Sequence, residues 1–409
     1  MRALYTALLR LALPFILLRL WWRGRREPRY RDAVGERFGR YRVPAKPGLV
    51  WIHAVSVGEA RAAAPLVRAL SDRPVLVTCT TAAGRETLEQ VYGDAVLAAY
   101  LPYDYPEAVE RFLRHFRPAL GILMETEVWP NLLLACKASG IPVVLANARM
   151  SAKSARGYAR WAGLTRPAFA SLAAVCAQST ADAERLRALG ARNVEVTGNL
   201  KFDAHPDAEQ IAAGQAWRAR LHRPVLLLAS TREGEEKLLL EEPTPAAVLV
   251  VVVPRHPQRF DEVAALADSR RTQQPVPRPG ERVHLGDTMG ELAFYYGACD
   301  VAVIGGGFAP LGGQNLIEAL ACGAPVVLGP HMFNFAEATR LALDAGAAVQ
   351  AADARSAMRA ALALLADQAR RQKMSAAGRK LCETHRGATA HHLAVCRRLL
   401  AQKGSEQFS

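Results

Sequence analysis

The sequence predicts an α/β fold built from two doubly wound parallel sheets. Short aliphatic or β-branched runs alternate with segments of helical composition along most of the 409 residues, which is the pattern of successive βαβ units. Residues 248–253 are all Val or Leu, as in a strand that helices cover on both faces. A polar stretch near the middle interrupts the alternation, and a chain of this length can form two domains with a core each.

The first half of the chain contains six candidate strands, at 49–54, 74–79, 96–100, 120–124, 142–147 and 174–177. Helical segments between them include 59–70, 105–115 and 130–139. Pro130 suits the first turn of a helix and Gly140 suits the position after its end. We therefore expect residues 32–205 to form a first Rossmann-like domain.

Residues 206–222 are polar, have Pro206 and Pro224 at their margins, and are predicted to be an interdomain linker containing one helix. The alternation then restarts, and residues 223–385 are expected to form a second Rossmann-like domain. Its candidate strands lie at 225–230, 247–254, 282–285, 300–305 and 325–329. The remaining residues, 386–409, are predicted to contain a C-terminal helix.

The first 31 residues predict a membrane anchor. Residues 3–22 are mostly apolar and about long enough as a helix to cross the hydrocarbon layer. Eight Arg and one Glu within residues 1–31 give this segment a charge of +7, which anionic lipid would hold at the cytoplasmic face. Arg10 complicates a simple span, because a mid-bilayer Arg costs about 2.5–3.5 kcal/mol. A shallow or tilted anchor therefore stays open beside a spanning one, and a helix packed on the protein's own body is the alternative.

Composition and motifs limit the remaining function classes. The net charge of +14 suits nucleic acid, anionic lipid or phosphorylated substrates, but few aromatic residues accompany the Arg residues, so nucleic acid is not expected as a partner. Seven scattered Cys without a CxxC pair argue against a disulfide framework or structural zinc. The sequence contains neither a dinucleotide-binding GxGxxG nor a P-loop, and no cofactor or metal is expected.

The segment 53–59, His-Ala-Val-Ser-Val-Gly-Glu, is the strongest single indication of chemistry. It places Glu59 in the first turn of a helix that follows a strand, at the edge where open α/β sheets bind their ligands. The helix N-terminus would favour the ionised carboxylate, as a general base requires. A Glu that only caps its helix is an equally good interpretation of this segment alone.

Four segments of the second half would meet at one sheet edge and suit a nucleotide. Pro254-Arg255-His256-Pro257 follows the aliphatic strand, and each of the other three segments, 286–291, 305–307 and 312–318, contains at least two Gly. Missing Cβ atoms let backbone approach a phosphate or sugar, and helix starts attract anions. Each segment alone is weak evidence for a ligand site. All four occur in this order within 70 residues, and together they predict a nucleotide site.

The chain resembles the 3-deoxy-D-manno-octulosonic acid (Kdo) transferases of lipopolysaccharide assembly along almost its whole length. The motifs that carry the resemblance are LYTALL at 4–9, HAVSVGE at 53–59, LPYD at 101–104, METE-WPN at 124–131, ANAR-SA-SA at 146–155, TGNLKFD at 197–203, PRHP at 254–257, GDTMGEL at 286–292, GG-N--EA at 312–319 and GPH-FNF at 329–335. The resemblance implies a GT-B glycosyltransferase with two Rossmann-like domains facing a cleft. It also implies metal-independent, inverting transfer of Kdo from CMP-Kdo to the lipid A precursor (lipid IVA), on the cytoplasmic side of the inner membrane.

The resemblance also assigns roles to individual residues. Glu59 is the implied proton acceptor, and Glu125 and Lys201 are implied transition-state stabilisers. Helix-capping carboxylates and an ordinary surface ammonium are the alternatives at 125 and 201, and the role of Glu127 stays undecided. The implied CMP contacts are Pro254, Arg255, Met289, Gly290, Glu291, Asn315, Leu316, Ile317 and Glu318.

A basic helix face is a candidate for acceptor contacts. Arg149, Lys153, Arg156 and Arg160 recur at helical spacing and would meet the acceptor's phosphates or anionic headgroups. A solvated helix face explains the same pattern.

Two rival functions also remain: a GT-B transferase or 2-epimerase acting on another nucleotide sugar, and a non-catalytic membrane scaffold that binds anionic lipid.

Overall fold

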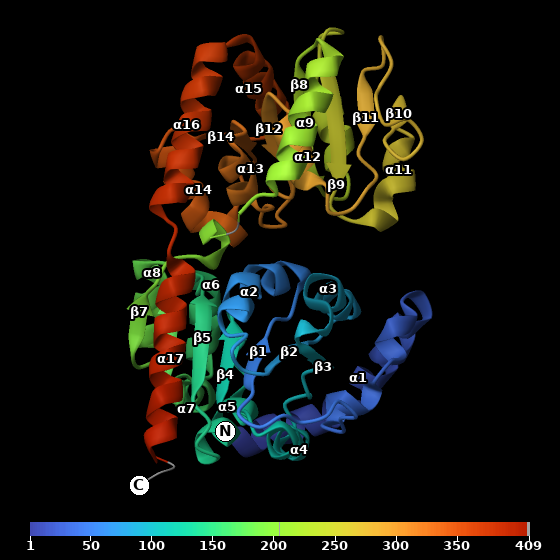
Figure 1. The fold of residues 1–409 in the computed structure, drawn as a ribbon. Coiled ribbons are helices and arrows are strands. Elements are labelled where there is room, and N and C mark those ends of the chain that lie inside the picture. The colour runs from blue at the N-terminus through green and yellow to red at the C-terminus, as the bar shows by residue number, and fades with distance from the viewer. Residues whose placement is uncertain (204, 407–409) are drawn as a thin grey trace. The chain divides into compact units, whose positions relative to one another are not determined.

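The computed structural model describes residues 1–203 and 205–406, and these divide into two compact units (Figure 1). The first unit consists of residues 1–203 together with the C-terminal segment from Arg386, and the second consists of residues 205–385. Each unit contains one seven-stranded sheet in which all paired strands are parallel. The predicted fold class, two doubly wound parallel sheets, is confirmed.

The first sheet has the strand order β3-β2-β1-β4-β5-β6-β7. Its strands are β1 Val50–His53, β2 Val75–Cys79, β3 Leu97–Tyr100, β4 Leu120–Met124, β5 Val143–Ala148, β6 Ala174–Ala177 and β7 Val194–Val196. The strand order reverses between β1 and β4, so the segments that follow these two strands diverge from one point of the carboxyl edge, where open α/β sheets bind ligands. The six predicted strands are present, whereas β7, a short and largely exposed edge strand, was missed.

The helices of the first unit form two layers. They are α1 Arg2–Arg26, α2 Val57–Ala69, α3 Ala82–Tyr92, α4 Pro106–Phe116, α5 Pro130–Ala138, α6 Ala152–Arg160, α7 Ala162–Phe169, α8 Thr180–Ala188 and α17 Ala388–Glu406. One core joins the sheet to α4, α5, α7 and α8, and the other joins it to α2, α3 and α17. In the first core Trp51 of β1 is fully buried and meets Phe112 edge to face at 4.9 Å. Gly121 of β4 leaves room for the Trp51 ring, because a Cβ there would lie 3.0 Å from it.

The second sheet has the strand order β10-β11-β9-β8-β12-β13-β14. Its strands are β8 Val225–Thr231, β9 Leu249–Pro254, β10 Ser269–Arg270, β11 Val283–Leu285, β12 Val301–Ile304, β13 Val326–Leu328 and β14 Ala348–Gln350. The helices of this unit are α9 Ala208–Leu221, α10 Glu235–Leu240, α11 Phe260–Ala264, α12 Leu292–Ala298, α13 Leu316–Cys322, α14 Ala336–Asp344, α15 Ala354–Ala366 and α16 Gln368–Thr384. The short strands β10 and β14 were not predicted, because runs of two and three residues carry little periodicity.

The helix predicted within the linker at 206–222 is present, and it belongs to the second compact unit. This segment forms α9, which packs on α12 as part of the second unit. Trp217 meets Phe294 edge to face at 5.7 Å, and Arg218 pairs with Asp300 at 2.9 Å. The polar composition that suggested a linker belongs to the solvent-facing side of α9, which is largely exposed.

The C-terminal helix α17 belongs to the first unit rather than to a separate region (Figure 1). Asp203, at the end of the first unit's continuous chain, accepts hydrogen bonds from the backbone N–H groups of Gly387 (2.7 Å) and Thr389. Ala388, Val395 and Cys396 of α17 join the core beside α2. The first unit is therefore completed by residues from both ends of the chain.

Helix α1 packs on the first unit along its first turns. Arg2 donates to the side chain of Asn131 (2.7 Å), Tyr5 donates to Asp104 (3.0 Å), and the backbone carbonyl of Leu9 accepts from Tyr105 (2.8 Å). The opposite side of α1 is apolar and exposed, and Leu11 and Phe15 expose more than 70% of their surface. By length and composition α1 is apolar enough to cross a membrane. The structure therefore combines two of the sequence interpretations, a helix docked on its own domain and an exposed apolar face.

The contact between α9 and α12 depends on Gly214. A Cβ at this position would lie 2.0 Å from the backbone oxygen of Phe294. Gly→Ala in a helix interior normally stabilises by about 1 kcal/mol, but here we expect Gly214→Ala to destabilise by about 1–3 kcal/mol through overpacking. Urea unfolding would measure the change, with the exposed α9 variant Gln215→Ala as control. A stabilising Gly214→Ala would contradict the packing of α9 in the second unit.

Candidate active site

Glu59 lies at the start of α2, at the carboxyl edge of the first sheet. Ser56 is the N-cap residue, and its hydroxyl donates to the Glu59 carboxylate (3.0 Å) and accepts from the Glu59 backbone N–H (3.4 Å). The second carboxylate oxygen accepts from the backbone N–H of Val55 (2.8 Å). Glu59 therefore caps its helix, as one of the two sequence interpretations proposed. The cap also fixes the carboxylate in one orientation, which a catalytic base needs.

The ionisation of Glu59 differs from the sequence expectation. Burial raises its pKa to about 7, and the negative charges of Glu125 and Glu127 add to the increase. The hydrogen bonds from Val55 and Ser56 oppose this shift without cancelling it. A carboxyl group that titrates near neutrality can accept a proton more readily than an ordinary surface Glu. Near neutral pH, Glu59 is therefore divided between its protonated and ionised forms rather than permanently ionised.

Glu125 follows β4 directly and forms a buried ion pair. Its carboxylate lies 2.8 Å from the Lys201 ammonium and 3.7 Å from the Arg149 guanidinium, and its side chain is only 12% exposed. Burial alone would raise the pKa of Glu125, but the two cations outweigh burial and hold it below the ordinary value. The backbone of Glu125 has a φ of +58°, a conformation that is strained for a residue with a side chain. Such strain is concentrated at functional sites.

A network that sequence reasoning missed holds Lys201 in place. The side-chain oxygen of Asn147 accepts from the backbone N–H of Leu200 (3.0 Å), and the backbone N–H of Asn147 donates to Nε2 of His392 (2.9 Å). Burial lowers the pKa of His392 to about 4, so its ring is neutral and can accept this bond. Asn147 lies inside the ANAR motif, which was a usable signal. His392 is 245 residues away on α17, and no local pattern connects the two.

Glu127, which the sequence left undecided, is an acceptor for Trp129. The indole Nε1 of Trp129 donates to the Glu127 carboxylate (2.7 Å), and burial raises the pKa of this carboxyl group. Its charge contributes to the raised pKa of Glu59. The structure therefore gives Glu127 a place beside the cluster of Glu59, Glu125 and Lys201.

The predicted basic face lies on α6 and is solvent-exposed. Lys153, Arg156 and Arg160 are exposed, and no residue of α6 is buried. Arg149 differs from them, because it precedes the helix and contacts Glu125. The structure thus separates one member of the predicted set, which joins the buried cluster, from three that face solvent.

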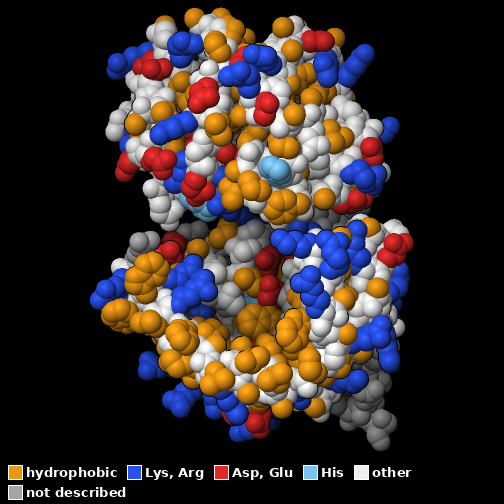
Figure 2. Space-filling model, turned by 180° about the vertical axis from the view of Figure 1, so that it is seen from behind, with side chains coloured by type: hydrophobic (Ala, Val, Ile, Leu, Met, Phe, Trp, Pro, Cys, Tyr) orange, Lys and Arg blue, Asp and Glu red, His pale blue; other side chains and the backbone are white. Residues whose placement is uncertain are grey.

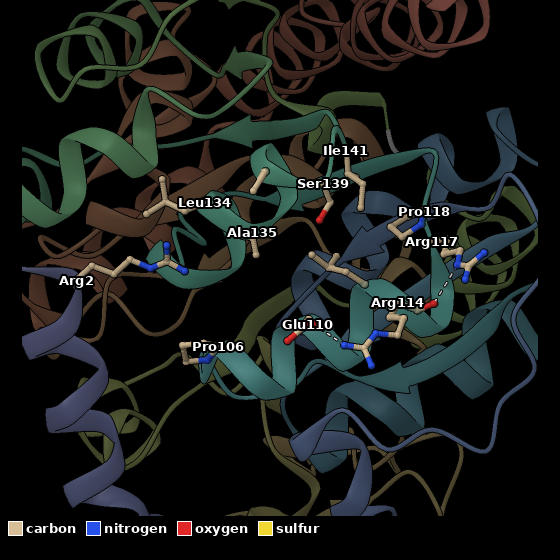
Figure 3. Close-up of a pocket in the computed structure, with 12 residues that line it drawn as sticks. Arg2, Pro106, Glu110, Arg114, Arg117, Pro118, Leu134, Ala135, Ser139 and Ile141 are labelled. Atoms are coloured by element: carbon tan, nitrogen blue, oxygen red, sulfur yellow. Dashed lines mark hydrogen bonds and ion pairs between the residues drawn. The ribbon is translucent and has the colours of Figure 1, made fainter. Parts of the chain in front are cut away.

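A cavity of about 710 Å³ on the first unit lies away from this cluster (Figure 3). Pro118 and Ile141, which line it, precede β4 and β5, so the cavity opens at the amino edge of the sheet. Arg114 pairs there with Glu110, and Arg117 donates to the backbone oxygen of Arg114 (3.3 Å). Because catalytic groups of open α/β folds gather at the carboxyl edge, we do not assign this cavity to the active site.

In the second unit, the expected nucleotide contacts lie at the carboxyl edge of its sheet. Pro254 ends β9, and the Arg255 backbone N–H donates to the Thr231 carbonyl (3.0 Å). Glu291 is paired with Arg271 at 2.7 Å, which lowers the pKa of its carboxyl group. Met289 is half exposed, and Gly290 between them has a φ of +83°, which favours Gly.

The segment 315–318 opens α13. Asn315 caps this helix by accepting from the Ile317 backbone N–H (3.1 Å), and its side-chain N–H donates to Glu318 (2.9 Å). The side chains of Leu316 and Ile317 are buried. A ligand at this edge would therefore meet Asn315, Glu318 and backbone atoms rather than the two aliphatic side chains.

The glycines at 305–307, which we predict to let backbone approach a phosphate or sugar, lie beside a buried carboxylate. The backbone N–H groups of Gly306 (2.6 Å) and Phe308 (3.0 Å) donate to the carboxylate of Glu235, which is 1% exposed. A Cβ on Gly305 would lie 2.6 Å from the backbone oxygen of Ser230. These glycines let β12 end against β8 and a buried carboxylate.

Within residues 1–203 and 205–406, no group of three or more His, Cys, Asp or Glu side chains is arranged to hold a metal ion.

Comparison with known proteins places these features in a family. Residues 32–204 match the sequence family described as 3-deoxy-D-manno-octulosonic-acid transferase (Kdo transferase), and residues 279–381 match the glycosyl transferases group 1. The chain is 49% identical to a 3-deoxy-D-manno-octulosonic acid transferase of Bordetella pertussis, over 96% of this chain and 98% of the relative. Identity to the enzyme of that name from Haemophilus influenzae is 36%, over 95% and 96% of the two chains.

Solved structures confirm the fold class. Anabaena Alr3699/HepE in complex with UDP matches with a TM-score of 0.59 and 15% identity, over 87% of this chain and 99% of that chain. UDP-GlcNAc 2-epimerase from Neisseria meningitidis matches with a TM-score of 0.57 and 16% identity, over 86% and 100%. At such low identity these likenesses concern the fold alone. Together with the glycosyl transferase match and the two sheets, they confirm the predicted GT-B type.

The electrostatic coupling between Glu59 and Glu125 can be tested by titration. We expect the Glu59 carboxyl group to titrate at about pH 7. Glu125→Gln should lower that pKa, because it removes a negative charge and leaves the Lys201 and Arg149 cations behind. Carbon NMR of glutamate-labelled protein, with the resonance assigned through its loss in Glu59→Gln, would measure both values. Glu184→Gln, an exposed change on α8, should leave the titration unaltered, and an ordinary Glu59 pKa in the unmodified protein would refute the coupling.

Proposed function

Because the chain belongs to the 3-deoxy-D-manno-octulosonic acid (Kdo) transferase family, we propose that it moves Kdo from CMP-Kdo to the lipid A precursor. Its family makes it a glycosyltransferase of lipopolysaccharide assembly. The observation that best supports the proposed chemistry is the cluster at the carboxyl edge of the first sheet. There Glu59, with a pKa of about 7, lies within electrostatic range of the Glu125–Lys201 ion pair.

Glu59 acts as the proton acceptor in this proposal. As the acceptor hydroxyl attacks the anomeric carbon of Kdo, its proton passes to the Glu59 carboxylate. The new carbon–oxygen bond forms while the bond from the anomeric carbon to the phosphate oxygen breaks, and CMP leaves with the electron pair. A single displacement of this kind inverts the anomeric centre. The hydrogen bonds from Val55 and Ser56 hold the base in position, so little reorganisation is needed.

The Glu125–Lys201 pair acts as a fixed source of charge. The Lys201 ammonium stabilises negative charge that develops as the phosphate departs or the hydroxyl loses its proton. Glu125 keeps Lys201 in place and makes Glu59 a stronger base through its own negative charge. Asn147 and His392 support the same segment by backbone contacts.

The second unit binds the donor in this proposal. Arg255 neutralises the phosphate of CMP, which a metal-independent enzyme must do with protein cations or dipoles. Met289, Gly290 and Glu291 provide a second group of contacts, and the remaining contacts are Asn315, Leu316, Ile317 and Glu318. The bonds Arg271–Glu291 and Asn315–Glu318 hold two of these carboxylates in fixed positions.

The membrane partner is anionic lipid of the inner membrane, with both units on the cytoplasmic side. Figure 2 shows a band of hydrophobic side chains on the lower unit and Lys and Arg side chains gathered beside it. The exposed hydrophobic residues of α1 include Leu11, Phe15, Leu18, Trp21 and Trp22. An apolar face with adjacent arginines is the usual composition of a helix that lies in a membrane interface.

Replacing the base tests the chemistry. We expect Glu59→Gln to lower kcat by roughly 10²–10⁴-fold, because Gln cannot accept the proton. Turnover would be measured with CMP-Kdo generated in situ and the tetra-acylated precursor, with EDTA present, and products counted by mass. In the unmodified enzyme, kcat/KM should fall as the pH drops below about 7, where Glu59 becomes protonated. Glu184→Gln serves as control, and unimpaired Glu59→Gln would exclude Glu59 as the base.

Charge reversal tests the acceptor contacts. We expect Lys153→Glu together with Arg156→Glu to raise the KM for a phosphorylated acceptor by roughly tenfold, through lost ionic contacts. The increase should be smaller for a dephosphorylated acceptor and at high salt. Arg220→Glu, the same change of charge on the exposed side of α9, should have no such effect. An unchanged acceptor KM in the double variant would show that α6 is only a solvated face.

A further inference from the structure

A second cavity of the first unit opens between α1 and the helices α6 and α7. Its volume is about 570 Å³, and none of its lining side chains is charged. Helix α1 contributes Leu4, Tyr5 and Leu8, and the α6–α7 region contributes Gly157, Tyr158 and Trp161.

The cavity is apolar and open to solvent at the same time. Leu4, Leu8 and Trp161 each expose more than half of their surface, which is costly for large apolar side chains in water. Exposed apolar surface of this kind usually marks a binding site. Along α1 it continues into the exposed side chains of Leu11 and Phe15, so a ligand could reach the cavity from a membrane interface.

The cavity adjoins the catalytic cluster through covalent and hydrogen-bonded neighbours. Val128 and Pro130 line it and follow Glu125 within five residues of chain. The hydroxyl of Tyr158, another lining residue, contacts the backbone oxygen of Thr126 (3.4 Å). Both β4 and β5 point their carboxyl ends toward this region, in contrast to the cavity of Figure 3, which opens at the opposite edge.

The chemistry around the cavity suits a ligand with an apolar chain and an anionic head. Lys153, Arg156 and Arg160 lie on the same helix as Gly157 and are exposed. A molecule that buries a hydrocarbon chain beside Gly157 would bring an attached phosphate within reach of these cations. A free hydrocarbon would gain nothing from them.

We propose that this cavity binds an acyl chain of the acceptor and thereby positions its sugar hydroxyl toward Glu59. The inference rests on the proposed function, since it concerns the acceptor of the same reaction. Burial of each methylene group contributes to affinity, and binding energy from a remote part of a substrate can be used to orient the reacting group. The enzyme should therefore prefer an acylated acceptor over the same phosphorylated disaccharide without acyl chains.

Gly157 offers a direct test. A Cβ at this position meets no atom within 4 Å, and the backbone there is ordinary α-helix, so Gly157→Leu would fill the cavity without a clash. The matched control is Ala159→Leu, which puts the same side chain on an exposed position of α6 outside the cavity.

The measurement is the ratio of kcat/KM for the tetra-acylated acceptor to that for the deacylated one, in detergent micelles. We expect Gly157→Leu to lower this ratio about tenfold, as when burial of roughly two methylene groups is lost, and Ala159→Leu to leave it near the unmodified value. Ser154→Leu, at another lining position, should act in the same direction and replaces Gly157→Leu if that variant does not fold.

Three outcomes would overturn the inference. A folded Gly157→Leu enzyme with an unaltered ratio would show that no acyl chain enters the cavity. Equal losses in Gly157→Leu and Ala159→Leu would assign the effect to the micelle surface. Weaker binding to vesicles of anionic phospholipid, with the ratio unaltered, would assign the cavity to bilayer lipid. Failure of the unmodified enzyme with both acceptors would instead contradict the proposed function.

Discussion

The buried ion pair between Glu125 and Lys201 is the interaction on which the site depends. Removing one partner of such a pair typically costs about 3–5 kcal/mol, because an uncompensated charge stays buried. The pair brings the end of β4, where Glu125 has a positive φ, together with the segment that follows β7. Burial, together with the negative charges of Glu125 and Glu127, raises the pKa of Glu59 to about 7.

Residues from both ends of the chain complete the domain that contains this pair. Helix α17 supplies His392, whose neutral ring accepts the Asn147 backbone N–H, and its first turn donates to Asp203, two residues after Lys201. Helix α1 packs on Asn131 and Asp104 at the other side of the same unit. The helix that carries the exposed apolar face is thus fixed to the same domain as the ion pair.

The sequence predicted the strands and helices of the backbone more completely than it predicted the contacts between side chains at the site. Alternating aliphatic runs located most strands, because burial on both faces leaves few other residues acceptable in a parallel sheet. Short edge strands such as β7 and β14 were not predicted, because their pairing with a neighbouring strand rather than their composition defines them. The segment of α9 suggested a linker because its exposed side is polar, whereas Gly214 and Trp217 pack it against α12. The backbone N–H groups of Gly306 and Phe308 donate to Glu235, about 70 residues earlier, a contact that no local pattern indicates.

The fold class, the family and the candidate residues Glu59, Glu125 and Lys201 follow from the amino-acid sequence, because strand periodicity and contiguous motifs are local properties of the chain. How those residues interact follows from the folded structure. The pKa of Glu59 depends on burial and on carboxylates more than 60 residues away, and the position of Lys201 depends on His392 at the far end of the chain. Charge and desolvation act through space, so no motif encodes them until the sheet has brought the segments together.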